Sequence, residues 1–307
     1  MRADPAFTLR QAEQVIATHA PQSLRQAIAK ALRVATQFRT ERVEDAELPI
    51  GASRFGGRPD LPVTIEWPQW NGFTAEDLVN ARGMRIPQGQ KAATLSFLAQ
   101  LHLAEIPDGT GLLPDKGWLF FFYDAAQQPW GFDPRDRGCA RVFYVDGDVA
   151  SLQRRDIPAA ADGMALHATK LTAELVATLP CWDFQLGLEL DKAARDAFGK
   201  LVDEHMAGWD PHHRLLGWPK PIQGEMELEC QLVTNGIYCG GPDGYGSEHA
   251  QRLKSGAVDW MLLLQIDSDE AGPGWMWGDA GCLYFWIRKQ DLEARRFENA
   301  WAILQCY

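Results

Sequence analysis

The side chains best suited to chemistry lie near the C-terminus, in an acidic, tryptophan-rich connection between two apolar segments. Asp267, Asp269 and Glu270 supply the carboxylate oxygens that calcium and magnesium ions prefer. Their spacing differs from that of an EF-hand loop, and a solvated turn whose acids cap backbone N–H groups is the simpler interpretation. These three residues are therefore weak metal candidates, and we expect no cofactor.

The same connection contains Trp275, Trp277 and Asp279. Residues two apart in an extended segment point to the same side, so both indoles and the carboxylate would share one face. Two tryptophans beside an aspartate suit a cationic or sugar-like ligand, or the centre of a protein interface. The alternative is that both rings cover the core of the second half of the chain.

A Gly/Pro corner earlier in the chain brings together Arg214, Trp218 and Gln223. With Gln265 from a later strand, they predict a polar pocket. The alternative is a buried glutamine bonded to backbone groups. The chain lacks a usable GxSxG, catalytic-cysteine or dinucleotide-loop motif, which makes an enzyme the less expected class.

Composition and charge also limit the partners and the location that we expect for this protein. The net charge of −11 argues against nucleic acid as a partner, because phosphate binding needs a basic face. No apolar stretch reaches the length of about 18 residues that suggests a membrane span. The six cysteines lack metal-site spacing, so we expect a reduced, cytoplasmic protein without membrane contact.

Hydrophobic periodicity predicts the elements that position these residues. Residues 8–38 have helical spacing divided by Pro21, and residues 191–206 predict a helix capped by Asp191. Residues 91–106 alternate as a half-buried strand, and the aromatic run 118–124 predicts a strand covered on both faces.

Two parts of the chain repeat the same order of features. Arg54 and Arg214 each lead into a Gly-x-Pro corner, and Gln100 and Gln265 follow at similar distances within apolar strands. An aromatic strand comes next in both parts, so an internal duplication is predicted. The expected organisation is an N-terminal helical segment (1–42), a first α+β repeat (43–150), a mixed connection (151–210) and a second repeat (211–307). Residues 43–307 are expected to form one compact domain.

Three stretches of the second repeat, LLGWPKPIQGEMELEC, LLLQIDSDE and GWMWGDAGCLYFWIRKQDL, carry a family resemblance. From about Leu48 to Tyr307 the chain resembles the YwqG-like family, the bacterial domain of unknown function DUF1963. The resemblance implies an α+β fold with a mostly antiparallel sheet and an internal duplication. The N-terminal helices expected from the periodicity would pack on this body. It implies no catalytic residues. Some relatives occur near bacterial toxin–immunity genes, an association that favours protein binding.

These observations predict a cytoplasmic, non-enzymatic protein–protein interaction module, of the immunity type, that binds through Trp275, Trp277 and Asp279. The alternative is a small-ligand-binding or hydrolase-like enzyme with a cleft between the repeats. That alternative uses Arg214 and Gln265, and it requires the carboxylates of residues 267, 269 and 279 to converge.

Overall fold

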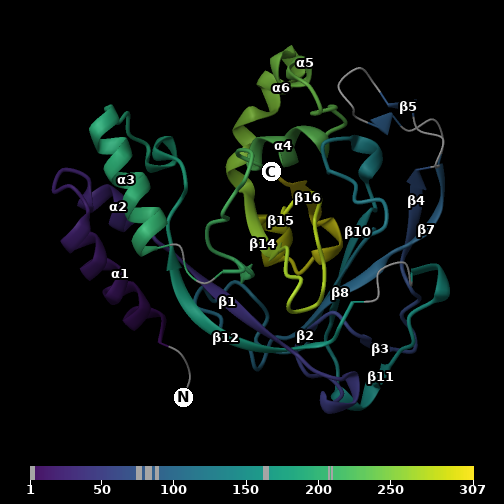
Figure 1. Cartoon of the computed structure of the whole chain (residues 1–307). Helices are drawn as coiled ribbons and strands as arrows, with labels where there is room; N and C mark the ends of the chain where they lie inside the picture. The colour runs from purple at the N-terminus through teal and green to yellow at the C-terminus, as the bar shows by residue number, and fades with distance from the viewer. Residues whose placement is uncertain are drawn as a thin grey trace.

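One curved sheet of ten antiparallel strands organises the chain in the computed structural model, which describes residues 4–73, 78–79, 85–86, 90–161, 166–206, 208 and 210–307 (Figure 1). The order across the sheet is β10-β9-β8-β2-β12-β1-β13-β14-β15-β16. The strands are β1 (Arg33–Arg42), β2 (Arg54–Phe55), β8 (Ser96–His102), β9 (Trp118–Tyr123), β10 (Ala140–Val145), β12 (Thr169–Thr178), β13 (Arg214–Leu215), β14 (Trp260–Asp267), β15 (Cys282–Arg288) and β16 (Trp301–Gln305). The expected α+β class with a mostly antiparallel sheet is confirmed.

Three small two-stranded sheets accompany the large one. They pair β3 (Asp60–Pro62) with β11 (Leu152–Arg154), β4 (Gln69–Phe73) with β7 (Gln90–Thr94), and β5 (Leu78–Val79) with β6 (Arg85–Ile86).

The helices form two groups on the outside of the sheet (Figure 1). One group is α1 (Pro5–His19), α2 (Arg25–Lys30) and α3 (Lys192–His205), which share a small apolar core around Ile28 and Phe198. The other group is α4 (Glu227–Val233), α5 (Pro242–Gly246) and α6 (Glu248–Leu253), and α7 (Lys289–Glu293) follows β15. No helix in the described ranges has both the length and the apolar character needed to cross a bilayer.

The main core fills the concave side of the sheet, where the two halves meet. Phe121 of β9 and Phe285 of β15 pack edge to face with ring centroids 5.1 Å apart. Both rings are fully buried, and aromatic pairs of this geometry add to the free energy gained from burial. The curvature of the sheet thus lets strands from opposite halves share one core.

The N-terminal segment is only partly helical. Pro21 does separate α1 from α2, and Asp191 caps α3 by accepting a hydrogen bond from the Ala194 N–H. The expected helix over 8–38 is wrong from Arg33 onward, because Val34–Phe38 are buried in succession within β1. A strand at the centre of a sheet is covered on both faces, so polar Thr36 and Gln37 are buried with their apolar neighbours and the strand lacks the alternation that would have identified it.

Two segments rich in apolar residues are not strands. The VTIEW segment (63–67) is a turn in which the Ile65 N–H donates to the Pro62 carbonyl (3.1 Å). Residues after the second corner form α4, whose apolar side packs on the outer face of β14–β16. Short apolar runs do not distinguish a buried helix from a strand.

The sheet has the same order of strands on either side of its central pair β1–β12. Outward from this pair run β2-β8-β9-β10 on one side and β13-β14-β15-β16 on the other. Arg54 pairs with Gln100 and Arg214 pairs with Gln265. The register shifts at the same place in both halves, between Phe97 and Ala99 and between Leu262 and Leu264.

A chain that lacks residues 1–42 is expected to lose cooperative unfolding, because β1 bonds to β12 along ten residues and to β13 on its other edge. Circular dichroism melting and size-exclusion chromatography measure the loss. The control removes residues 1–20 only, which deletes α1 and keeps β1; it should melt cooperatively at a lower temperature. A 43–307 chain that melts cooperatively near the full-length temperature would contradict the central role of β1.

Candidate functional site

Trp275 and Trp277 lie in the core and not on the surface. Both side chains are 0% exposed, and their ring centroids are 5.5 Å apart. Trp275 packs against Phe55, Trp277 packs against Tyr123, and the Trp275 indole N–H donates to the Asp267 carbonyl (2.7 Å). The expectation that these rings form a binding surface is therefore wrong, and only Asp279 of the three is exposed. The connection turns back on itself through a bridge between Asp269 and Trp275, which carries both indoles inward.

The acidic residues of this connection are engaged separately. Asp267 accepts hydrogen bonds from the backbone N–H groups of His212 and Ser268. Asp269 accepts from the Thr40 hydroxyl (2.6 Å), the Gly272 N–H (2.7 Å) and the His213 ring (3.3 Å). Glu270 is exposed. Within the residues that the structure describes, no three His, Cys, Asp or Glu side chains come together as a metal site.

His213 and Asp269 form a buried pair that neighbouring groups hold in place. The His213 Nδ1 atom accepts from the Asp267 N–H (3.1 Å), which leaves Nε2 as the donor that faces Asp269. Burial raises the pKa of Asp269, but the bonds from His213, Thr40 and Gly272 outweigh it and lower the pKa to about 2. This pair ties β1, the second corner and the acidic connection together.

Gln265 bonds to the backbone, as the simpler interpretation of this residue had it. Its Oε1 accepts from the Lys220 N–H (2.9 Å), and its Nε2 donates to the His212 carbonyl (2.8 Å). Arg214 is also buried and donates to the Trp218 carbonyl (3.0 Å). Gln223 is exposed, and its backbone N–H donates to the Gln305 side chain. These residues thus build the second corner.

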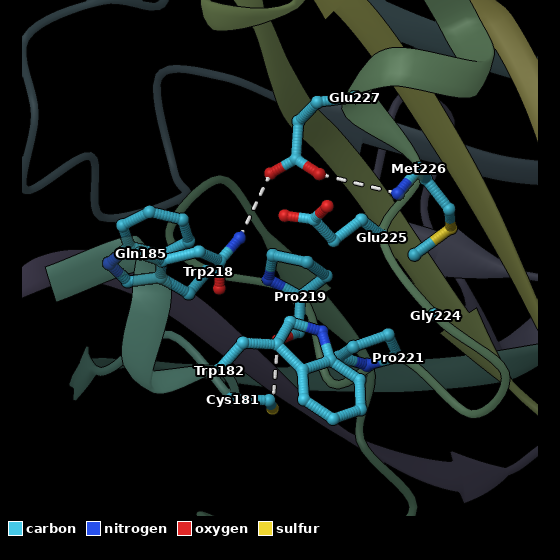
Figure 2. Close-up of a pocket in the computed structure, with 10 residues that line it drawn as sticks. All are labelled: Cys181, Trp182, Gln185, Trp218, Pro219, Pro221, Gly224, Glu225, Met226 and Glu227. Carbon is cyan, nitrogen blue, oxygen red and sulfur yellow. Dashed lines mark hydrogen bonds between the residues drawn. The ribbon is translucent and has the colours of Figure 1, made fainter. Parts of the chain in front are cut away.

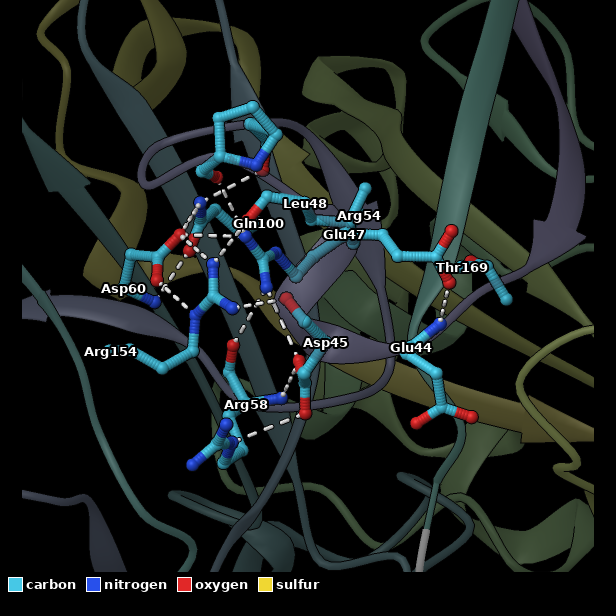
Figure 3. A network of polar contacts seen from close by, with 12 residues as sticks. Glu44, Asp45, Glu47, Leu48, Arg54, Arg58, Asp60, Gln100, Arg154 and Thr169 are labelled. Atoms are coloured by element: carbon cyan, nitrogen blue, oxygen red, sulfur yellow. Dashed lines mark hydrogen bonds and ion pairs between the residues drawn. The ribbon is translucent and has the colours of Figure 1, made fainter.

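The equivalent first corner is closed by charge (Figure 3). Asp60 is fully buried and accepts from Arg54 (2.8 Å) and Arg154 (2.6 Å) and from the Gly51 N–H (2.8 Å). Gln100 repeats the contacts of Gln265, accepting from the Asp60 N–H (2.7 Å) and donating to the Ala52 carbonyl (2.9 Å). These donors offset the cost of burying the Asp60 carboxylate, so the interior of this corner is filled by paired charges.

The second corner has Lys220 where the first has Asp60, and an open groove lies beside it. The groove has a volume of about 580 Å³ and runs between α2 and the corner. Its lining includes Lys30, Arg33, Gln185, Leu186 and Trp218. This volume falls within the range of small-ligand sites.

Arg33 is held flat on the Trp218 ring, with its guanidinium carbon 3.4 Å from the ring centroid. The ring is fixed because its N–H donates to the Ala31 carbonyl (2.7 Å). The Thr178 hydroxyl joins the two residues, accepting from the Trp218 N–H (2.9 Å) and donating to the Arg33 carbonyl (3.0 Å). The corner approaches this closely because Gly217 has φ +73° and a Cβ there would lie 2.8 Å from the Thr178 hydroxyl.

The guanidinium of Arg33 is available to a ligand. The residue is exposed, and its side chain donates no hydrogen bond to any residue in the described part of the chain. Partial burial lowers the pKa of Arg33, while the nearby charge of Glu227 raises it. An arginine side chain stays protonated in proteins, so the groove contains a fixed cation.

A small cavity of about 10 Å³ adjoins the groove and shares Gln185 and Trp218 with it. Figure 2 shows Trp182, Glu225 and Glu227 around this cavity. Gln185 donates to Glu227 (3.5 Å), and the Met226 N–H donates to the other oxygen (3.3 Å). Burial raises the pKa of both glutamates, and the charge of Glu227 raises that of Glu225 further.

Sequence reasoning identified Trp218 but missed the other residues of this site. Arg33 follows α2, Trp182 and Gln185 follow β12, and the two glutamates precede or begin α4. No local spacing connects three such segments.

Fold and site together define an α+β protein that is built on one antiparallel sheet and has an open polar groove at its second corner. The chain belongs to the family described as "Domain of unknown function (DUF1963)", whose model matches residues 53–306. The resemblance seen in the sequence is thereby confirmed. No curated protein matches the chain. The match begins after α1, α2 and β1, so Arg33 lies outside it.

Trp277→Ala should lower the free energy of unfolding by about 3–5 kcal/mol, because it leaves a large cavity in a packed core. Urea denaturation followed by tryptophan fluorescence measures the change. Asp279→Ala, two residues away and exposed, is the control and should change stability by less than about 0.5 kcal/mol. If the Trp277→Ala protein is as stable as the wild type, the Trp277 ring is not part of the core.

Asp269→Asn should destabilise the protein at neutral pH by about 1–3 kcal/mol, the cost of breaking a buried hydrogen-bond set. In the wild type the pKa of Asp269 is about 2, below its ordinary 3.8, so the ionised form stabilises the fold above about pH 4. This stabilisation disappears as the pH falls from about 4 to 2, and the variant should lack that step. If the wild type and the variant lose stability in parallel as the pH falls, the pairing of His213 with Asp269 does not stabilise the fold.

Proposed function

We propose that this is a binding protein that holds a negatively charged group of its ligand, a carboxylate or a phosphate, in the groove beside Trp218. The observation that carries the proposal is Arg33, stacked 3.4 Å above the Trp218 ring with its donors unused. A guanidinium offers a planar fork that matches two oxygens of an anion. Stacking fixes this fork before the ligand arrives, so little side-chain freedom is lost on binding.

The surroundings of Arg33 favour the same ligand. Lys30 is exposed on the same side of the groove and adds a second positive charge. Gln26 of α2 lies one turn before Lys30 and supplies an amide donor. The protein as a whole carries a net charge of −11, which makes this local concentration of cations selective for an anion that fits the groove.

We therefore propose the same general function that the sequence predicted, binding, but at a different site. A protein partner of this groove would present a side-chain or terminal carboxylate to Arg33, in place of a hydrophobic surface to Trp275 and Trp277. The six cysteines are free thiols, which supports the reducing cytoplasm as the proposed location.

We also propose that the two halves of the sheet arose by internal duplication. The equal strand order, the equivalent Arg–Gln pairs and the equivalent register shifts support it. In this view one copy has a corner closed around Asp60, and the other has Lys220 at the equivalent position. Trp218 is the residue that the second copy contributes to the groove, whose other lining residues come from α2, the residues after it and the connection after β12.

Arg33→Gln should weaken the binding of a simple carboxylate, Nα-acetyl-norleucine, by about tenfold or more, because a charge-assisted hydrogen-bond pair is lost. Titration followed by amide chemical shifts measures the dissociation constant. Arg33→Lys keeps the positive charge but lacks the planar guanidinium, so its affinity should lie between those of the wild type and Arg33→Gln. Arg10→Gln, exposed on α1, is the control and should bind like the wild type. Equal affinity in Arg33→Gln and wild type, or no binding at all, would overturn the proposal.

A further inference from the structure

We propose that the small cavity beside the groove is a subsite for a primary ammonium group, so that the ligand carries both a carboxylate and a primary amine. A lysine with a free α-carboxylate has these two groups. This inference rests on the proposed function, since the carboxylate of the same ligand is held by Arg33. It adds the second recognition element and names the ligand class.

The size of the cavity selects the group. A volume of about 10 Å³ is room for one water-sized group. A primary ammonium has this size and three donors, whereas a guanidinium or a trimethylated amine is larger. The cavity therefore favours the end of a lysine-like chain over that of an arginine-like chain.

The lining of the cavity suits a cation. Glu225 and Glu227 lie on one side, and the indoles of Trp182 and Trp218 lie on the other (Figure 2). An ammonium between carboxylates and aromatic faces gains from both kinds of contact. Glu225 accepts no hydrogen bond from a residue in the described ranges, so its oxygens remain available to a ligand.

The two sites belong to one continuous surface. Trp218 and Gln185 line both the groove and the cavity, so a ligand that lies along them reaches Arg33 at one end and the glutamates at the other. The Glu227 charge also acts on the pKa of Arg33, which places the two groups within electrostatic reach. A ligand with one charge of each sign would satisfy both ends at once.

The test compares four probes that differ at one end: Nα-acetyl-lysine, Nα-acetyl-norleucine without the amine, Nα-acetyl-arginine with the larger cation, and Nα-acetyl-lysine amide without the acid. Dissociation constants come from amide chemical shifts of the full chain. Nα-acetyl-lysine should bind about tenfold more tightly than each of the other three, since each lacks one ionic contact or does not fit. Glu225→Gln and Glu227→Gln should each reduce the preference for lysine over norleucine. Glu248→Gln, exposed on α6, should leave it unchanged.

The outcomes separate this inference from the proposed function. Equal affinities for the lysine and norleucine probes, both weakened by Arg33→Gln, would mean that the cavity holds water only; the anion site would stand and the ammonium subsite would fall. An arginine probe that binds as tightly as the lysine probe would also overturn the subsite. Failure of all four probes would remove the proposed function itself. Glu225 is exposed, so its variant should fold and keeps the test valid if Glu227→Gln does not.

Discussion

The pairing of β1 with β12 is the constraint on which the rest of the structure depends. It joins the two halves of the sheet along ten residue pairs, and the other edge of β1 bonds to β13. The same register builds the groove, because it sets Arg33 opposite Thr178, whose hydroxyl also binds the Trp218 backbone. One strand pairing therefore determines both the continuity of the core and the position of the exposed cation.

The two corners show how a shared backbone arrangement supports different surroundings. In both, a buried glutamine bonds to the chain two residues before and six residues after an arginine. At the first corner, Asp60 pairs with both Arg54 and Arg154, and Asp45 is a second partner of Arg54, so the interior is closed by ion pairs. Lys220 at the second corner contacts His212. A change of one side-chain charge is thus associated with a closed corner on one side of the sheet and a groove on the other.

Sequence reasoning recovered the parts of the fold with long, strongly patterned segments. The strands around Gln100, Phe121 and Gln265 were identified because apolar and aromatic runs of strand length leave few alternatives. β1 was missed because its apolar residues continue the helical spacing of α2 without a break. The indoles of the acidic connection were placed outside, because alternation in an extended segment does not reveal a turn that carries both inward. The groove is formed by tertiary contacts among three segments that are distant in the sequence. Local sequence patterns therefore could not predict it.

The central position of β1 also has a consequence for the newly made chain. β1 leaves the ribosome before its partner β12, which begins only at Thr169, roughly 130 residues later at about 5–20 residues per second. For on the order of ten seconds, β1 therefore has two open edges and no partner in the sheet. The preceding helices α1 and α2 emerge with it, while α3, which completes their apolar core, arrives later still. The topology thus delays completion of the central strand pair until β2, β8, β9 and β10 of one half of the sheet have been made.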